Sequence, residues 1–311
     1  LEWYFNRNEN LTRLTDYAPV NQRGFAQFAA KNYPALGAAA GIPSAAERLR
    51  GAADGGVLLT PDKDLEVLAY NDYHSLAIAD FLIRLGQAAR KALAGDRKLL
   101  GCYYGYTFEL PGMPGGVQLG GHRNLAQVLD AGLFDFIMSP PSYQLRGIGE
   151  PVADMKPFRT LQYHNILPLI DDDTRTHLIP KSGFAQTLNM EQTRMVMRRN
   201  HALALCRLQP IELLPLTYGN EFNAPELIAD LKVLAKVGNF CLKKEVERHA
   251  EVAAVVSETA LKYLPLENRA VRNGERQLRY TADGQPQNGA VAPVAFAGEA
   301  IAWQRKVLSE F

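Results

Sequence analysis

The 311-residue chain is poor in cysteine and has no long apolar run, and these two absences exclude several classes of protein. Its three cysteines, Cys102, Cys206 and Cys241, have no short mutual spacing, so neither a disulfide framework nor a zinc motif is indicated. No stretch of roughly eighteen apolar residues is present, and the first residues lack the charged-then-apolar pattern of a secretory signal. We therefore expect no membrane partner. A cytoplasmic and a periplasmic or secreted location both stay open.

The chain also lacks an excess of charge of either sign. Its 34 Lys and Arg against 33 Asp and Glu give a formal net charge of +1, and no basic stripe could neutralise phosphates, so we expect no nucleic-acid partner. The glycine-rich run "GMPGGVQLGG" lacks the spacing of a phosphate-binding loop, and no GxSxG nucleophile elbow is present. These absences argue against nucleotide binding and against a serine hydrolase, and we expect no cofactor.

What the sequence does contain is an alternation of short apolar runs and amphipathic stretches. Apolar residues at three and four spacing predict helices at 21–33, 64–93, 124–132, 190–205 and 225–240. Compact apolar runs predict strands at 99–106, 134–139, 165–171 and 211–217. Buried strands separated by helices indicate an α/β fold with a parallel sheet.

The segment after residue 245 has a different pattern. The run "AEVAAVVSE" at 250–258 predicts one more strand, a Gly-, Gln-, Asn- and Pro-rich loop follows, and residues 298–308 again predict a helix. This pattern indicates the opening of a second α/β unit, whose one strand and one helix have little to pack against. We therefore divide the chain into a first domain at 1–245 and the start of a second, truncated domain at 246–311.

The predicted strands end in polar or aromatic clusters, among them "YGYTFE", "SPPSY", "DDDTRTH" and "YGNEF". Carboxyl ends of parallel strands carry the active site in a TIM barrel and the ligand site in a doubly wound sheet, so these clusters predict a site at one edge. Alternation along the strand places Asp171 and Asp173 on one face and Asp172 on the other. Arg175 in the same turn competes with a cation, which disfavours a metal site.

Paired carboxylate catalysis fits this cluster better. Glycoside cleavage needs one carboxyl group to protonate the leaving oxygen and a second to attack the sugar carbon. An arginine beside the nucleophile keeps it ionised, whereas the acid needs an apolar setting that raises its pKa. Asp171 near Arg175 suits the role of nucleophile, and Glu2 beside three aromatic residues suits the role of acid.

From about Leu1 to Leu216 the chain resembles the β-galactosidase-related glycoside hydrolases of the family 42 type, including uncharacterised bacterial relatives. The most specific segments are "YYGYTFEL", "SPPSYQLRG" and "DDDTRTHL". The resemblance implies a (β/α)8 TIM barrel and a retaining mechanism, with Glu2 at the acid/base position after strand four and Asp171 at the nucleophile position after strand seven. The four predicted strands become strands five to eight, and the N-terminal part of the barrel is expected to be missing from the chain.

The resemblance also implies a carbohydrate substrate, such as a β-galactoside, and a homo-oligomer, trimer or dimer, formed through an amidotransferase-like second domain. The pocket residues that it implies are Tyr104, Tyr106, Glu109, Tyr143, Arg146, Asp173, Arg175 and His177. For the two tyrosines at 104 and 106, core packing is an equally good interpretation from the residues.

Two departures from the family pattern keep other functions open. Relatives usually have Glu where this chain has Asp171, which leaves the carboxylate roughly 1 to 1.5 Å farther from the sugar. The segment "LLPLTYGNEF" lacks the tryptophan-rich sequence expected for a sugar platform. A catalytically inactive carbohydrate-binding or structural relative is therefore the principal alternative. A metal-assisted enzyme using Asp171, Asp173 and His177 is a weaker one.

Overall fold

The protein is built around a four-stranded parallel sheet whose strands follow one another in chain order. The computed structural model describes residues 14, 16–37, 39–49, 51–54, 58–96, 98–112, 116–143, 145–180, 185–216, 219–244 and 255–266. The strands are β1 (Gly101–Tyr103), β2 (Phe136–Ser139), β3 (Leu167–Asp172) and β4 (Ile211–Leu213). All three strand pairs are parallel, so the predicted α/β class, the four strands and their parallel pairing are confirmed.

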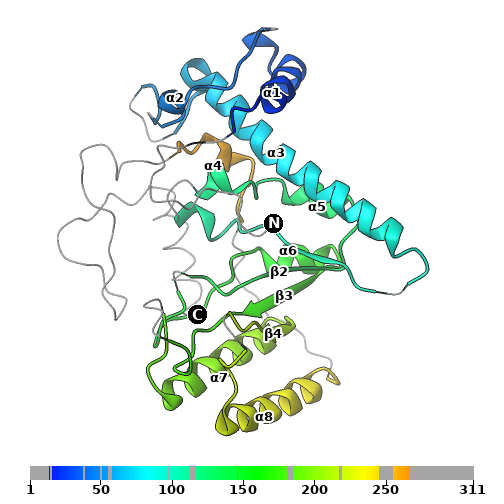
Figure 1. Cartoon of the computed structure of the whole chain (residues 1–311), viewed down its shortest axis with the longest axis vertical. Helices are drawn as coiled ribbons and strands as arrows, with labels where there is room; N and C mark the ends of the chain where they lie inside the picture. The colour runs from blue at the N-terminus through cyan, green and yellow to red at the C-terminus, as the bar shows by residue number, and fades with distance from the viewer. Residues whose placement is uncertain are drawn as a thin grey trace, which may run out of the picture.

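Helices surround this sheet (Figure 1). The long helix α3 (Pro61–Ala92) runs past one side, and α7 (Met190–Cys206) packs against α8 (Pro225–Cys241) on the other. The remaining elements are α1 (Pro19–Asn32), η1 (Pro34–Leu36), α2 (Ala45–Leu49), η2 (Leu110–Gly112), α4 (Gly116–Gly120), α5 (Leu125–Asp130), α6 (Phe158–Tyr163) and η3 (Ala260–Tyr263). The five predicted helices are confirmed. Within the described ranges no helix is both long enough and apolar enough to cross a membrane.

Local signals in the sequence explain where the main helices begin. Proline occupies the first turn of α1, α3 and α8, where its missing N–H lacks a partner in any case. At the start of α7, the Asn189 side chain accepts a hydrogen bond from the Gln192 N–H at 2.9 Å. In α3, Asp64 has non-helical backbone angles, and its carboxylate accepts from the N–H groups of Ala53 and Thr60, each at 3.0 Å.

The main apolar core lies between α3, α5 and the sheet. Its buried members are Ile78, Ala79, Leu82, Tyr104, Leu125, Val128, Leu129, Phe134, Ile137, Leu161 and Ile166. Gly101 allows the close pairing of β1 with β2, because a Cβ at this position would overlap the Phe136 ring. The sheet therefore depends on a residue without a side chain at the start of β1.

The segment 255–266 corrects one prediction. Residues 255–258 are irregular and turn, so the predicted strand at 250–258 is wrong there, and residues 250–254 lie outside the described residues. An apolar run of this length fits a strand, but here the chain turns into η3, and Leu261 and Leu264 join a core cluster with Tyr106. The predicted helix at 298–308 also lies outside the described residues.

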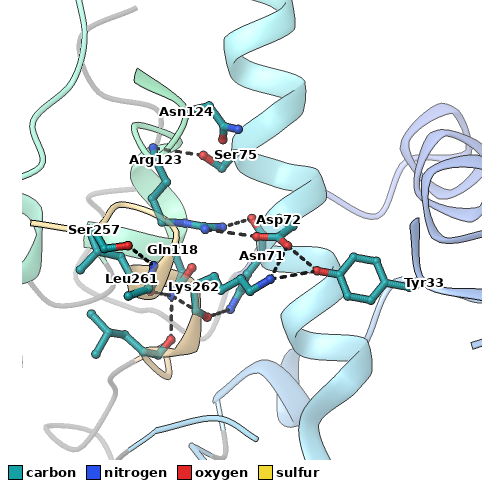
Figure 2. A network of polar contacts seen from close by, with 12 residues as sticks. Tyr33, Asn71, Asp72, Ser75, Gln118, Arg123, Asn124, Ser257, Leu261 and Lys262 are labelled. Atoms are coloured by element: carbon teal, nitrogen blue, oxygen red, sulfur yellow. Dashed lines mark hydrogen bonds and ion pairs between the residues drawn. The ribbon is translucent and has the colours of Figure 1, made fainter. Parts of the chain in front are cut away.

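Polar contacts fix this segment to α3 and α4 (Figure 2). Asp72 on α3 accepts from the Tyr33 hydroxyl, forms ion pairs with Lys262 at 3.1 Å and Arg123 at 3.3 Å, and lies between these three groups. The Gln118 amide of α4 donates to the backbone carbonyls of residues 261 and 264 at 2.9 and 2.7 Å. The described part of the segment is thus integrated with the helices beside the sheet.

Candidate functional site

The three consecutive aspartates lie at the carboxyl end of β3 and are all buried. Asp171, Asp172 and Asp173 are 1%, 0% and 2% exposed, so the cluster is not a solvated loop. Burying three neighbouring carboxyl groups is costly unless each is paired or hydrogen-bonded. The structure gives each of the three a different set of partners.

Asp171 receives a hydrogen bond from across the sheet. The Tyr103 hydroxyl, at the end of β1, donates to Asp171 Oδ2 at 2.7 Å. Because β2 lies between β1 and β3, this side chain reaches over the carboxyl end of the intervening strand. The hydrogen bond orients the carboxylate and gives one of its buried oxygens a partner.

Tyr103 was missed by the sequence analysis, which selected its neighbours Tyr104 and Tyr106 for the pocket. Tyr104 is 1% exposed, donates to the Gly121 carbonyl at 2.9 Å and stacks on His122. Tyr106 is 0% exposed and belongs to the core. The reason for the difference is that successive side chains of a strand face opposite sides, so an error of one residue selects the wrong face. The structure therefore places both predicted tyrosines in core packing.

Asp172 binds the turn that follows β3. Its Oδ1 accepts from the Thr174 N–H at 3.2 Å and from the Thr174 hydroxyl at 2.5 Å. Its Oδ2 accepts from the Asn200 amide of α7 at 3.0 Å. These contacts give Asp172 a structural role that joins the strand end to the next helix.

Asp173 forms the charged centre of a larger cluster. Arg146, itself 6% exposed, pairs with Asp173 Oδ1 at 2.6 Å, and Arg175 lies 3.9 Å from Oδ2. The Tyr143 hydroxyl donates to the same oxygen at 3.3 Å, while the Arg146 guanidinium lies 4.4 Å from the centre of the Tyr143 ring. Asp173 is thus neutralised within the protein by arginine.

Glu109 fixes the loop that carries Tyr143. Its carboxylate is fully buried and accepts from the Ser142 hydroxyl at 2.7 Å and from the Tyr143 N–H at 3.0 Å. Five of the predicted pocket residues therefore belong to one connected network: Glu109, Tyr143, Arg146, Asp173 and Arg175.

The structure describes one of the two remaining predicted residues, His177. His177 Nδ1 lies 2.7 Å from the Thr193 hydroxyl on α7, which gives this histidine a partner outside the aspartate cluster. Glu2, the predicted acid, lies outside the described residues.

Lys156 is a further buried charge that the sequence analysis did not identify. Its side chain is fully buried, and Nζ donates to Ser139 Oγ at 2.8 Å and to the Leu169 carbonyl at 2.9 Å. Burial lowers the pKa of Lys156 to about 8. A lone lysine in a loop carries no sequence signal for this role, because only the three-dimensional structure brings it beside the ends of β2 and β3.

Nothing in the described part of the chain forms a group of three or more His, Cys, Asp or Glu side chains suited to a metal ion. The contacts explain this for the residues of the metal hypothesis. Asp173 is paired with Arg146, and His177 bonds to Thr193.

The fold and the site define an α/β protein with a buried acidic cluster at the carboxyl edge of a parallel sheet. No protein-family model, no curated protein and no solved structure matches the chain. The geometry of this cluster, and the chemistry that such a cluster can perform, are therefore what indicates a function.

Proposed function

We propose that this chain is part of a retaining glycoside hydrolase, in which β1 to β4 are strands five to eight of a TIM barrel. Asp171 acts as the nucleophile and Glu2 as the general acid and base, on a β-galactoside or a related glycan. The observation that carries the proposal is the position of Asp171. Its carboxylate is buried at the carboxyl end of a parallel strand and is held there by the Tyr103 hydroxyl.

The chemistry requires two steps and no cofactor. An Asp171 oxygen forms a bond to the anomeric carbon while the glycosidic bond breaks, and Glu2 gives its proton to the departing oxygen. A water molecule, deprotonated by Glu2, then attacks the same carbon and releases Asp171 from the glycosyl ester. Retention of configuration follows because the sugar carbon is inverted twice.

The surroundings of Asp171 suit a nucleophile. A carboxylate attacks only when it is ionised, and the hydrogen bond from Tyr103 favours that state. Arg146 is already paired with the neighbouring Asp173, so the charge of Asp173 is neutralised. Asp171, in contrast, accepts a hydrogen bond from the uncharged Tyr103 hydroxyl. This difference supports Asp171 over Asp173 for the nucleophilic role.

Substrate contacts are proposed for the partly exposed members of the network. The Arg175 side chain is 21% exposed and lies 6.0 Å from the Tyr143 ring centre, so both can offer donors or an aromatic face to sugar hydroxyls. Glu109 and Arg146 are buried and act by holding this loop. Tyr104 and Tyr106 pack in the core and receive no substrate contact in the proposal.

A second candidate function follows from the shortness and burial of Asp171. An aspartate carries one methylene fewer than the glutamate of the resembling family, and the side chain is only 1% exposed. A displacement of about 1 Å in a reacting group can reduce the rate on the order of a hundredfold. The competing function is a non-catalytic relative that binds carbohydrate or serves a structural role, as a monomer or as an oligomer.

A kinetic screen distinguishes these functions. The full-length protein is assayed on a panel of aryl β-glycosides, and Asp171→Asn, Asp171→Glu and Glu2→Gln are compared with wild type. Asp96→Asn serves as a control, because this carboxylate is 63% exposed and pairs with Lys98 instead. We expect Asp171→Asn and Glu2→Gln to lose activity and the control to retain it. Unchanged rates in Asp171→Asn and in Glu2→Gln would rule out the assignment. Binding of sugar without turnover by the wild type would favour the second candidate.

A further inference from the structure

Helix α8 is rich in apolar residues, yet most of its surface is exposed. Its buried residues are Leu227, which packs with Met197 of α7, and Asp230, which accepts a hydrogen bond from Arg194 of α7. The helix lies at the end of the molecule opposite α1 and α2 (Figure 1). A surface helix normally turns its apolar side to the core and its charged side to solvent. The exposed apolar residues of α8 therefore indicate a second contact surface.

These exposed residues form one stripe along the helix. Ala229, Val233, Val237 and Phe240 follow one another at spacings of three and four residues, which places them on the same side of α8. The two valines are 57% and 42% exposed, and Phe240 is 62% exposed. We call these four residues the α8 stripe.

The α8 stripe has an acidic residue at one end and a basic residue at the other. Glu226 lies one turn before Ala229, and Lys244 lies one turn after Phe240. The Lys244 ammonium is 5.2 Å from the centre of the Phe240 ring, so this lysine is on the same side of the helix as the stripe. An apolar row with opposite charges at its two ends is complementary to a copy of itself that runs in the opposite direction.

We propose that α8 is a homodimer interface, in which two copies of this chain pack their α8 stripes together in antiparallel orientation. A twofold axis beside Ala235 places Val233 against the partner's Val237, and Glu226 opposite the partner's Lys244. Parallel packing would instead bring each charge beside its own copy, which is unfavourable. A second copy fits the stripe because both halves of the complementary surface are present in one chain.

A contact limited to α8 makes a weak dimer. The helix has 17 residues and is therefore roughly 25 Å long. One pair of helices of this length buries less than the roughly 800 Å² per partner of a standard stable interface. We expect a dissociation constant on the order of 10 to 100 µM. The proposal concerns assembly and does not rest on the proposed function.

The first test is sedimentation equilibrium of the full-length protein from about 1 to about 300 µM, a range that brackets this dissociation constant. We expect Val233→Asp to weaken the dimer by about tenfold or more, since it brings a carboxylate into the apolar centre of the interface. Val20→Asp is the matched control, because Val20 lies on α1 and is 67% exposed. Circular dichroism checks that both variants are folded. A monomeric wild type over the whole range, or equal dimerisation of the two variants, would overturn the proposal.

The second test reverses the charges at the ends of the stripe. Glu226→Lys and Lys244→Glu alone each create two like-charged pairs across the dimer and should weaken it by about threefold to tenfold. The double variant restores the opposite charges and should return to within about twofold of the wild type. Failure of the double variant to recover would refute the antiparallel arrangement. Slow hydrogen exchange of the α8 amides in a monomeric wild type would show that another part of the full-length protein covers the stripe, and would also overturn the proposal.

Discussion

The buried Lys156 gives the sharpest prediction for stability. Burial lowers its pKa from the ordinary value of 10.5 to about 8. One pH unit of difference corresponds to about 1.36 kcal/mol, so the lysine lowers the free energy of unfolding by about 3 kcal/mol when it is charged in both states. This penalty is present at neutral pH, where the folded protein holds the ammonium in a fully buried position.

The sign of the pH dependence follows from the protons bound in each state. Between about pH 8 and about pH 10.5 the folded protein has lost the Lys156 proton while the unfolded chain still keeps it. The unfolded state then binds more protons, so stability rises with pH through this window. Substituting methionine removes the titrating group and therefore this contribution.

The assay is chemical unfolding of wild type and Lys156→Met, followed by circular dichroism at several pH values from about 7 to 10.5. Other lysines and tyrosines titrate in both proteins, so their contributions cancel in the difference. The wild type should gain about 3 kcal/mol relative to Lys156→Met across the window. Lys98→Met, at an exposed position, should give a flat difference. A flat difference for Lys156→Met as well would refute the reasoning that a buried ammonium is present at neutral pH.

Three further substitutions test other parts of the structure. Tyr103→Phe removes the hydrogen bond to the nucleophile and should lower kcat on an aryl β-galactoside by about tenfold or more, while Tyr104→Phe should not; equal rates for both would contradict the assigned contact. Gly101→Ala forces a methyl group into the Phe136 ring and should lower the free energy of unfolding by about 1 to 3 kcal/mol, which thermal unfolding measures; an unchanged midpoint would contradict the packing. Asp72→Ala removes the common acceptor of three donors and should cost about 2 kcal/mol in the same assay, and a neutral effect would show that the network in Figure 2 adds nothing to stability.

The order of strands was predictable because each is a compact apolar run. β1 to β4 are shorter than predicted, since the runs continue past the paired residues: the prediction at 211–217 became Ile211–Leu213. The failure at 255–258 has a different origin. Val255 is 90% exposed, so the described end of this apolar run is not buried, and Leu261 and Leu264, which follow the run, supply the buried contacts.

The sequence predicted which edge of the sheet carries the site, but it did not predict which side chains contact the aspartates. Parallel strands bring their carboxyl ends together, which is why the aspartates, Tyr143 and Arg146 meet. The choice between Tyr103 and Tyr104 depends on the residue at which β1 ends, and sequence patterns place such boundaries only to within a few residues. Lys156 required the three-dimensional structure, because nothing in the residues around it indicates that its side chain is buried beside β2 and β3.

The central claim is that Asp171 forms a covalent bond to the sugar. An aryl 2-deoxy-2-fluoro-β-galactoside, whose fluorine slows release of the glycosyl ester, is incubated with the full-length protein, and the digested protein is analysed by mass spectrometry. The account predicts the mass of one fluorosugar on the peptide that contains Asp171, and its loss in Asp171→Asn. A label on a different residue, or turnover of ordinary aryl galactosides without any label, would contradict it.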